Sequence, residues 1–215
     1  MTYLEVVNNV LRRLREEEVS SVQDTTYSKM VGDFVNDAKR MVENAWDWSA
    51  VRLTMTVTTV DDVFNYVLTD SQNRLKVLDV INDTTNEFME YRPQHWFNEK
   101  YLIQPVLKGA PQYYTFNGVD PSGDTQIDIY PKPDAEYLIR FNAVVPDDDL
   151  TADADDMVVP AAPVIHLAVA LLARERGETG GTSAAEYFSI ADKFLSDAIA
   201  IDAAKHPEET IWSYV

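Results

Sequence analysis

The sequence of 215 residues contains no cysteine. Its absence excludes disulfide bonds, thiolate metal sites and cysteine nucleophiles, and it is consistent with a reducing compartment. Glycine is also scarce, with 7 residues, which argues against a multi-bladed or glycine-linked architecture. No apolar run approaches the roughly 18 residues that a transmembrane helix needs. Charged residues interrupt the N-terminal stretch where a signal peptide would be apolar, so we expect neither a signal peptide nor contact with a membrane.

Basic residues are also few, because 18 lysines and arginines face 36 acidic residues and give a net charge of -18. A chain this acidic is not expected to bind nucleic acid by neutralising phosphates. One interpretation is that the charge provides solubility. The other is that it forms a surface that lies beside DNA without adhering to it. The excess gathers towards the C-terminus, since residues 146–215 carry 4 basic and 14 acidic groups.

The periodicity of apolar residues changes twice along the chain. Helical spacing runs through residues 2–16 and 25–49 and returns in two segments after Pro160. Strand-like alternation and turn signals occupy the middle, where Glu87 to Tyr91 is one of the expected strands. The order predicts an α+β fold, in which a helical bundle formed by the N- and C-terminal helices carries an inserted β-rich region. The expected parts are a bundle of 1–50 and 157–205, a β-rich insert of 51–146, a flexible acidic loop of 147–156 and a docking tail of 206–215.

Local signals set the expected helix ends. Thr2 and Glu5 have the spacing of a capping box, Asp24 or Thr25 can cap the second helix, and Thr182 or Ser183 the last. The last helix is expected to bury a broad apolar face made of Tyr187, Phe188, Ala191, Phe194, Leu195, Ala198 and Ile201. Trp46 and Trp48 end the second helix and cannot share a helix face, so we expect one in the core and the other against the β region or another chain.

No residue pattern predicts a catalytic, cofactor or metal site. His95, His166 and His206 lie far apart and lack metal-ligand spacing, and no GxSxG motif occurs. The GETGG sequence of 177–181 lacks the lysine and the preceding strand of a phosphate loop. The acidic segment lacks the glycine and glutamate of an EF-hand. The sequence therefore predicts a protein that is not an enzyme.

A run of aromatic residues in the β-rich region permits two interpretations. The run comprises Tyr91, His95, Trp96, Phe97, Tyr101, Tyr113 and Tyr114. These rings are expected to form the core of a sheet under one covering helix. Alternatively they form a platform on which sugars stack.

The N-terminal helices resemble a known family. The stretches LEVVNNVLRRL and YSKMVGDFVNDAKRMVENAWDWSAVR are similar to the head-to-tail adaptor proteins of short-tailed bacteriophages, also called tail tubular protein A. The resemblance is carried by Val7-Asn8, by Asn36-Asp37-Ala38 and by Trp46-Asp47-Trp48 before Arg52. It covers about the first 50 residues in motif and most of the chain in layout.

The resemblance implies a structural virion protein in the tail or neck, assembled in the host cytoplasm. Such adaptors form a homo-oligomeric ring, usually of twelve copies, between the portal protein and the tail nozzle protein. Genome DNA passes through the ring during ejection without sequence-specific binding.

We further hypothesise which residues would serve this role. The interface residues are Arg12, Arg13, Arg15, Trp48, Ile211, Trp212 and Tyr214, and the channel-facing acids are Asp192, Asp197 and Asp202. Two alternatives remain at this stage. One is a carbohydrate-binding or hydrolytic tail component that uses the aromatic β region, because two carboxylates suffice for glycoside hydrolysis. The other is an acidic mimic of DNA.

Overall fold

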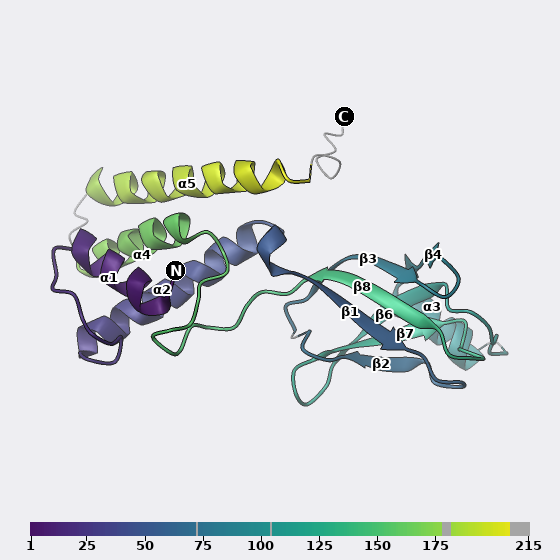
Figure 1. The fold of residues 1–215 in the computed structure, drawn as a ribbon. Helices are drawn as coiled ribbons and strands as arrows, with labels where there is room; N and C mark the ends of the chain where they lie inside the picture. The colour runs from purple at the N-terminus through teal and green to yellow at the C-terminus, as the bar shows by residue number, and fades with distance from the viewer. Residues whose placement is uncertain (72, 104, 178–181, 207–215) are drawn as a thin grey trace. The chain divides into compact units, whose positions relative to one another are not determined.

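The chain divides into two compact units, one made of Met1–Val51 with Pro146–Val215 and the other of Arg52–Val145. The structure is a computed structural model that describes residues 1–71, 73–103, 105–177 and 182–206 (Figure 1). Helices make up the first unit and two β-sheets with a short helical segment make up the second. The predicted α+β class is confirmed.

The helical unit contains α1 (Tyr3–Arg13), α2 (Thr26–Ala45), the short 3-10 helix η1 (Ser49–Val51), α4 (Ala161–Glu175) and α5 (Thr182–Ala203). The central element is α4, which contacts α1, α2 and α5. Its side chains are buried around most of the helix, from Val164 to Ala173, as expected of a helix that is apolar on every side. The outermost helix is α5, which lies along α4 (Figure 1).

The caps of the first two helices follow the sequence signals. The Thr2 hydroxyl accepts a hydrogen bond from the Glu5 backbone N–H at 3.3 Å, and the Glu5 carboxylate accepts one from the Thr2 N–H at 2.9 Å. This confirms the predicted capping box. Thr25 caps α2 and exchanges the same pair of bonds with Ser28. The expected cap at Thr182 or Ser183 falls on side chains outside those described.

The second helix ends earlier than the sequence suggests. Trp46 has extended backbone angles and terminates α2, so Trp46 and Trp48 do not form its last turn. Trp48 is only 1% exposed, and its indole N–H donates to the Val42 carbonyl at 2.7 Å. Trp46 is partly exposed. Trp48 is therefore the tryptophan that enters the core, and its side chain is not exposed for the interface at which it was hypothesised.

Two asparagines from the motifs that carry the family resemblance each bind the backbone of a residue far along the chain. The Asn8 amide donates to the Val19 carbonyl at 3.0 Å and accepts from the Val19 N–H at 2.9 Å. Asn36 makes the same pair with Leu150, at 3.0 and 2.9 Å. Each amide satisfies both backbone groups of one residue, as a neighbouring strand would. These two asparagines therefore fasten the α1–α2 loop and the acidic segment to the helices.

The acidic segment 147–156 is held along its length, which the expectation of a flexible loop did not anticipate. Lys39 is fully buried, donates to the carbonyls of Asp147 and Asp148 at 2.9 and 2.8 Å, and pairs with Glu43 at 2.8 Å. Arg40 binds the Asp149 carboxylate through two nitrogens. Further along, the Tyr3 N–H donates to the Asp155 carbonyl at 2.8 Å. The segment therefore docks on α2 and on the start of α1.

The second unit is a pair of four-stranded sheets. Its strands are β1 (Arg52–Thr58), β2 (Asn65–Leu68), β3 (Lys76–Asn82), β4 (Glu87–Phe88), β5 (Glu90–Tyr91), β6 (Tyr113–Val119), β7 (Thr125–Tyr130) and β8 (Leu138–Val144). One sheet has the order β1-β8-β3-β4 and the other β2-β7-β6-β5. All pairings are antiparallel except that of β5 with β6. Between β5 and β6 lie α3 (Gln94–Asn98) and a π-helical turn, η2 (Glu99–Ile103).

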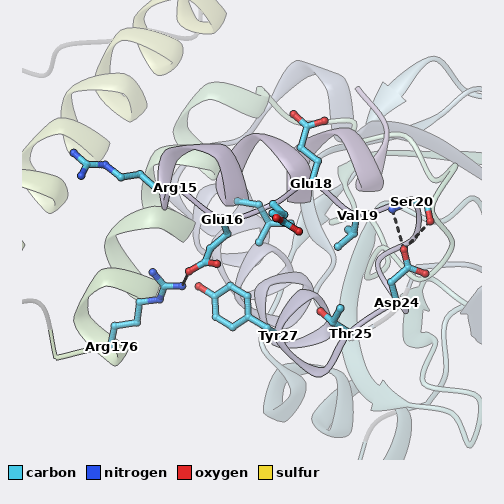
Figure 2. Close-up of a pocket in the computed structure, with 11 residues that line it drawn as sticks. Arg15, Glu16, Glu18, Val19, Ser20, Asp24, Thr25, Tyr27 and Arg176 are labelled. Atoms are coloured by element: carbon cyan, nitrogen blue, oxygen red, sulfur yellow. Dashed lines mark hydrogen bonds and ion pairs between the residues drawn. The ribbon is translucent and has the colours of Figure 1, made fainter.

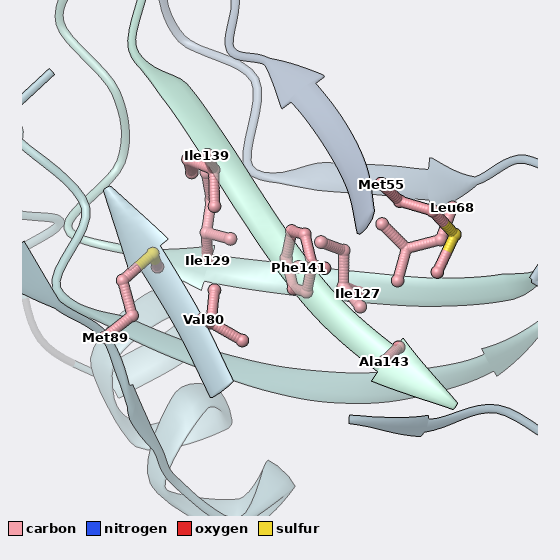
Figure 3. Packing of buried hydrophobic residues seen from close by; sticks show 9 residues of the cluster. All are labelled: Met55, Leu68, Val80, Met89, Ile127, Ile129, Ile139, Phe141 and Ala143. Carbon is pink, nitrogen blue, oxygen red and sulfur yellow. The ribbon is translucent and has the colours of Figure 1, made fainter. Parts of the chain in front are cut away.

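Both sheets contribute to one core (Figure 3). In β8 the buried residues Ile139, Phe141 and Ala143 alternate with polar or exposed ones, which is the period-two pattern of a strand with one covered face. They meet Ile127 and Ile129 of β7, in the opposite sheet. The full cluster is Met55, Leu68, Val80, Met89, Ile127, Ile129, Ile139, Phe141 and Ala143. This face-to-face packing of two sheets is a β-sandwich.

One expected strand is divided between the two sheets. Residues 87–91 were predicted as a single strand, but β4 pairs with β3 and β5 pairs with β6. Between them Met89 is buried, and its N–H donates to the Val80 carbonyl at 2.8 Å. The Glu90 N–H donates instead to the carbonyl of Gln112, which directly precedes β6 of the other sheet, at 2.9 Å. The segment therefore crosses from one sheet to the other and closes one side of the sandwich.

Candidate functional site

The most unusual surface of the helical unit is an apolar flank on α5. Its large side chains are exposed by 42% at Tyr187, 43% at Ile190, 38% at Phe194 and 69% at Ile201. These positions are three, four and seven residues apart, so they share one side of the helix. Contiguous exposed apolar surface of this kind marks an interaction site. We call these four residues the α5 flank.

The α5 flank corrects the expectation for the last helix. Tyr187, Phe194 and Ile201 were predicted to face inward, yet they are exposed. Of the seven residues predicted to form the buried face of this helix, only Ala191 is fully buried. The physical reason is that α5 packs on one neighbour, α4, which covers a narrower stripe than the apolar residues occupy. Ile190 was not singled out in the sequence. The available signal was that apolar residues surround α5 on more than one side.

A groove lies beside the α5 flank, between the start of α4 and the second half of α5. Pro160, Ala162 and Pro163 form one wall, and Phe194, Ala198 and Ile201 form the other. Its volume is about 400 Å³, and Asp197, Asp202 and Lys205 stand at its edge. Phe194 is fixed by stacking on the His166 ring, with centroids 4.0 Å apart and planes at 10°. The groove is thus a mainly apolar surface with a charged rim.

Asp202 joins the end of α5 to the segment after α2. Its carboxylate accepts hydrogen bonds from the Ser49 N–H at 2.9 Å, the Ser49 hydroxyl at 2.5 Å and the Trp46 indole at 3.2 Å. Lys205 donates to the same carboxylate at 3.0 Å. Asp202 is 5% exposed. Its carboxylate is therefore committed to contacts inside the helical unit.

These partners also set the protonation of Asp202. Burial alone raises the pKa of a carboxyl group. Here the hydrogen bonds from Ser49 and the charge and hydrogen bond of Lys205 outweigh burial and lower the pKa of Asp202 to about 2. The carboxylate stays ionised and locks α5 to residues 46–49. Of the three acids expected at a channel, only Asp192 and Asp197 are exposed.

A second hollow, of about 930 Å³, lies where the α1–α2 loop approaches the end of α4 (Figure 2). Arg176 pairs with Glu16 at 2.5 Å and lies 4.8 Å above the centre of the Tyr27 ring. At the opposite end the Asp24 carboxylate accepts hydrogen bonds from the backbone and hydroxyl of Ser20. The lining mixes both signs of charge. The charged groups named here already have partners within the chain.

The arginines predicted at an interface lie around this end of α1. Arg12 pairs with Glu18 at 2.7 Å, whereas Arg13 and Arg15 are exposed. Arg15 follows the α1 cap with a φ of 60°, the left-handed conformation in which helices commonly end. In Figure 2 it points away from the Arg176–Glu16 pair. The interface role of these three arginines stays a prediction. The same holds for Ile211, Trp212 and Tyr214, which lie outside the described residues.

Most of the aromatic run of the β unit packs together, while Tyr91 and His95 are exposed. The Trp96 ring lies 5.0 Å from Tyr113 and 5.3 Å from Tyr130 between centroids, and it meets Tyr130 edge to face. Phe97 is buried. The Tyr101 hydroxyl donates to the Ile129 carbonyl at 2.5 Å, and burial raises the pKa of Tyr101. These contacts favour the sheet-and-covering-helix interpretation over a sugar-stacking platform.

The β unit carries its own exposed apolar segment, at the end of η2. Leu102 and Ile103 are exposed by 78% and 79%. Val106 and Leu107 are also exposed. These aliphatic residues stand close together in the sequence, but the sequence analysis did not identify them as exposed.

The described residues contain neither a cluster of metal-ligating side chains nor a helix that could span a membrane. No group of three or more histidine, aspartate or glutamate side chains is arranged to hold a metal ion in that part of the chain. Within the same residues, none of the helices has the length and apolar character needed to cross a membrane.

Comparison with known proteins identifies a family. The family model described as SU10 adaptor protein matches residues 1–208, and therefore both the helical unit and the β unit. No curated protein matches the sequence. The predicted resemblance to a phage head-to-tail adaptor, which rested on motifs in the first 50 residues, is confirmed at the level of the family.

Proposed function

The chain belongs to the SU10 adaptor protein family, and from this membership we propose that it forms the ring that joins the portal protein to the tail nozzle protein and lines the DNA channel. The observation that carries the proposal is the match over residues 1–208. Membership of an adaptor family indicates a structural, non-enzymatic component of a bacteriophage, placed in the neck of the virion. The ring would contain twelve copies, as in tail tubular protein A.

The helical unit, a bundle of helices from both ends of the chain, would form the wall of this ring. Its α5 flank exposes Tyr187, Ile190, Phe194 and Ile201, which a neighbouring subunit or the portal would cover. Arg12, Arg13 and Arg15 would make ionic contacts at the other end of the unit. Oligomer interfaces combine an apolar centre with a polar rim in this way.

The C-terminal tail would contribute a further contact. Residues 207–215 include Ile211, Trp212 and Tyr214 within nine residues. Aromatic residues of this type are enriched at interfaces. In the assembled neck the tail would dock on an adjacent subunit or on the portal.

The charge of the chain suits a channel for DNA. A net charge of -18 opposes binding to phosphates, so duplex can slide past the ring. The exposed acids Asp192 and Asp197 are the members of the hypothesised channel set that remain available. They are five residues apart, which separates them by about 140° around the helix. One helix therefore presents one of them at a time to a channel along its axis.

The experiment that tests the proposal is a measurement of mass by light scattering. The purified chain is measured alone and then with portal rings, and a variant lacking residues 207–215 is measured in parallel. We expect either a ring or a monomer that joins the portal in many copies, with weaker docking for the truncated variant. A full-length monomer that ignores the portal would contradict the adaptor role. Equal docking by the truncated variant would contradict only the role of the tail.

A further inference from the structure

The groove between α4 and α5 has an apolar interior and lies within reach of an apolar segment of the same chain. The last described residue, His206, lies three positions after the end of α5 at Ala203, and nine more residues with the sequence PEETIWSYV come after it. Pro207 cannot continue the helix without loss of a backbone hydrogen bond, so the chain can change direction there. We infer that in the free subunit residues 211–214 fold back into the groove of their own chain.

The distances permit this return. Trp212 lies six positions after His206, and an extended chain covers about 20 Å in six residue steps. The groove wall on α5 runs from Phe194 to Lys205, which is about 17 Å along a helix. Trp212 therefore reaches every point of the groove from the end of α5. No other subunit is needed.

The chemistry of the two surfaces matches. The walls are proline, alanine, phenylalanine and isoleucine side chains, and the volume of about 400 Å³ lies within the range of pockets that bind small organic groups. An isoleucine and a tryptophan bury their apolar surface there. Burial of the charged Glu208 and Glu209 among apolar walls would cost their hydration, so the charged start of the tail stays outside and the apolar part enters.

Because the tail is tethered to α5, it binds the groove of its own chain in preference to the groove of another copy. A segment joined by a few residues experiences an effective concentration in the millimolar range, far above that of a second subunit in dilute solution. The tail thus covers the groove and Ile201 before assembly, and it must leave the groove before it can contact a portal. This self-contact does not depend on the proposed ring.

Cysteine cross-linking tests the inference, because the natural chain has no cysteine. Ser213→Cys is combined with Ala198→Cys, which lines the groove, or with Ala200→Cys, which is exposed on α5 outside it. The two alanines are two residues apart on one helix, so the tether length is nearly equal. On mild oxidation of dilute protein, we expect an intramolecular disulfide that forms about tenfold faster with Ala198→Cys.

Two further variants confirm the docking surface. Ile201→Asp should abolish the rate advantage of the Ala198→Cys pair, whereas Ile190→Asp, on the same helix but outside the groove, should leave it unchanged. Equal rates for the two cysteine pairs, or cross-linked dimers in place of the intramolecular product, would overturn the inference. All these measurements use the free subunit, so their failure is separate from a failure of the adaptor proposal.

Discussion

At the scale of single residues, Asp202 acts as an electrostatic lock between α5 and residues 46–49. Its folded-state pKa of about 2 lies below the value of 3.8 for an unperturbed aspartate. A group with a depressed pKa stabilises the folded state above its unfolded pKa, and this contribution is lost as the pH falls through the folded pKa. The window in which stability declines therefore runs from about pH 4 to about pH 2.

The first prediction concerns Asp202→Asn. The substitution should lower the free energy of unfolding at pH 7 by about 2 kcal/mol, the equivalent of the pKa shift, and the difference from the natural chain should shrink towards pH 2. Urea denaturation at several pH values measures both effects. Asp192→Asn, at an exposed position on the same helix, should change stability by less than about 0.5 kcal/mol. Equal stability of the Asp202→Asn variant and the natural chain at pH 7 would refute the lock.

Sequence reasoning located residues such as Thr2, Thr25 and Asn36 but not the partners of most of them. Capping signals are local, so Thr2 with Glu5 was recognised from spacing alone. Asn36 with Leu150 and Ser49 with Asp202 join positions more than a hundred residues apart, and no local pattern specifies which of 36 acids is buried. Asp202 was accordingly grouped with Asp192 and Asp197 as a surface acid.

At the scale of elements, the contact between α1 and α2 depends on a glycine. Gly32 lies inside α2, and a Cβ added there would collide with the Tyr3 hydroxyl oxygen and come within 2.9 Å of a Val22 methyl carbon. Tyr3 is buried, and burial, with a smaller effect of Asp33, raises the pKa of its hydroxyl to about 12. The lack of a side chain at this position allows α1 to approach α2 closely.

The second prediction is that Gly32→Ala destabilises the helical unit. Alanine is the better helix former by about 1 kcal/mol, but the collision should outweigh this gain and lower the free energy of unfolding by about 1–3 kcal/mol. Thermal or urea denaturation measures the change. The double variant Tyr3→Phe/Gly32→Ala removes the nearest atom and should recover part of the loss relative to Tyr3→Phe alone. If Gly32→Ala stabilised the protein, propensity and not packing would control this position.

The sequence predicted which segments are helices or strands. It did not predict which sheet a strand joins or how many neighbours cover a helix. Alternation of apolar residues and threonines predicted the strand at residues 53–58, which is β1. In β8 the buried residues Ile139, Phe141 and Ala143 show that one face of the strand is covered. The crossing at Met89 was missed, because a strand that changes sheets keeps the same alternation as one that does not. The exposure of α5 was missed for a related reason. An apolar helix is expected to be covered, and the sequence does not state how many neighbours cover it.

At the scale of the whole molecule, the acid balance and the apolar flank act on different partners. Apolar surface favours contact with protein, while net negative charge opposes contact with DNA. On α5 both occur together, and Asp197 lies at the edge of the groove beside the flank, whereas Asp192 lies elsewhere on the helix. If a partner covers the flank, Asp197 is close to that protein contact and Asp192 is freer to face a channel.

The last prediction follows from this arrangement and concerns the ejection of DNA. Asp192→Lys should slow ejection more than Asp197→Lys, because it places a positive charge where phosphates pass, in every subunit of the ring. Each substitution changes the charge by the same amount, so each serves as the other's control. Ejection is followed by dye fluorescence from particles that carry one variant or the other, after light scattering has shown that both variants assemble. Slowing should weaken at higher salt, as expected for an electrostatic contact with DNA. Unchanged ejection in both variants would mean that these acids do not face the channel, and a stronger effect of Asp197→Lys would mean that the flank faces it instead.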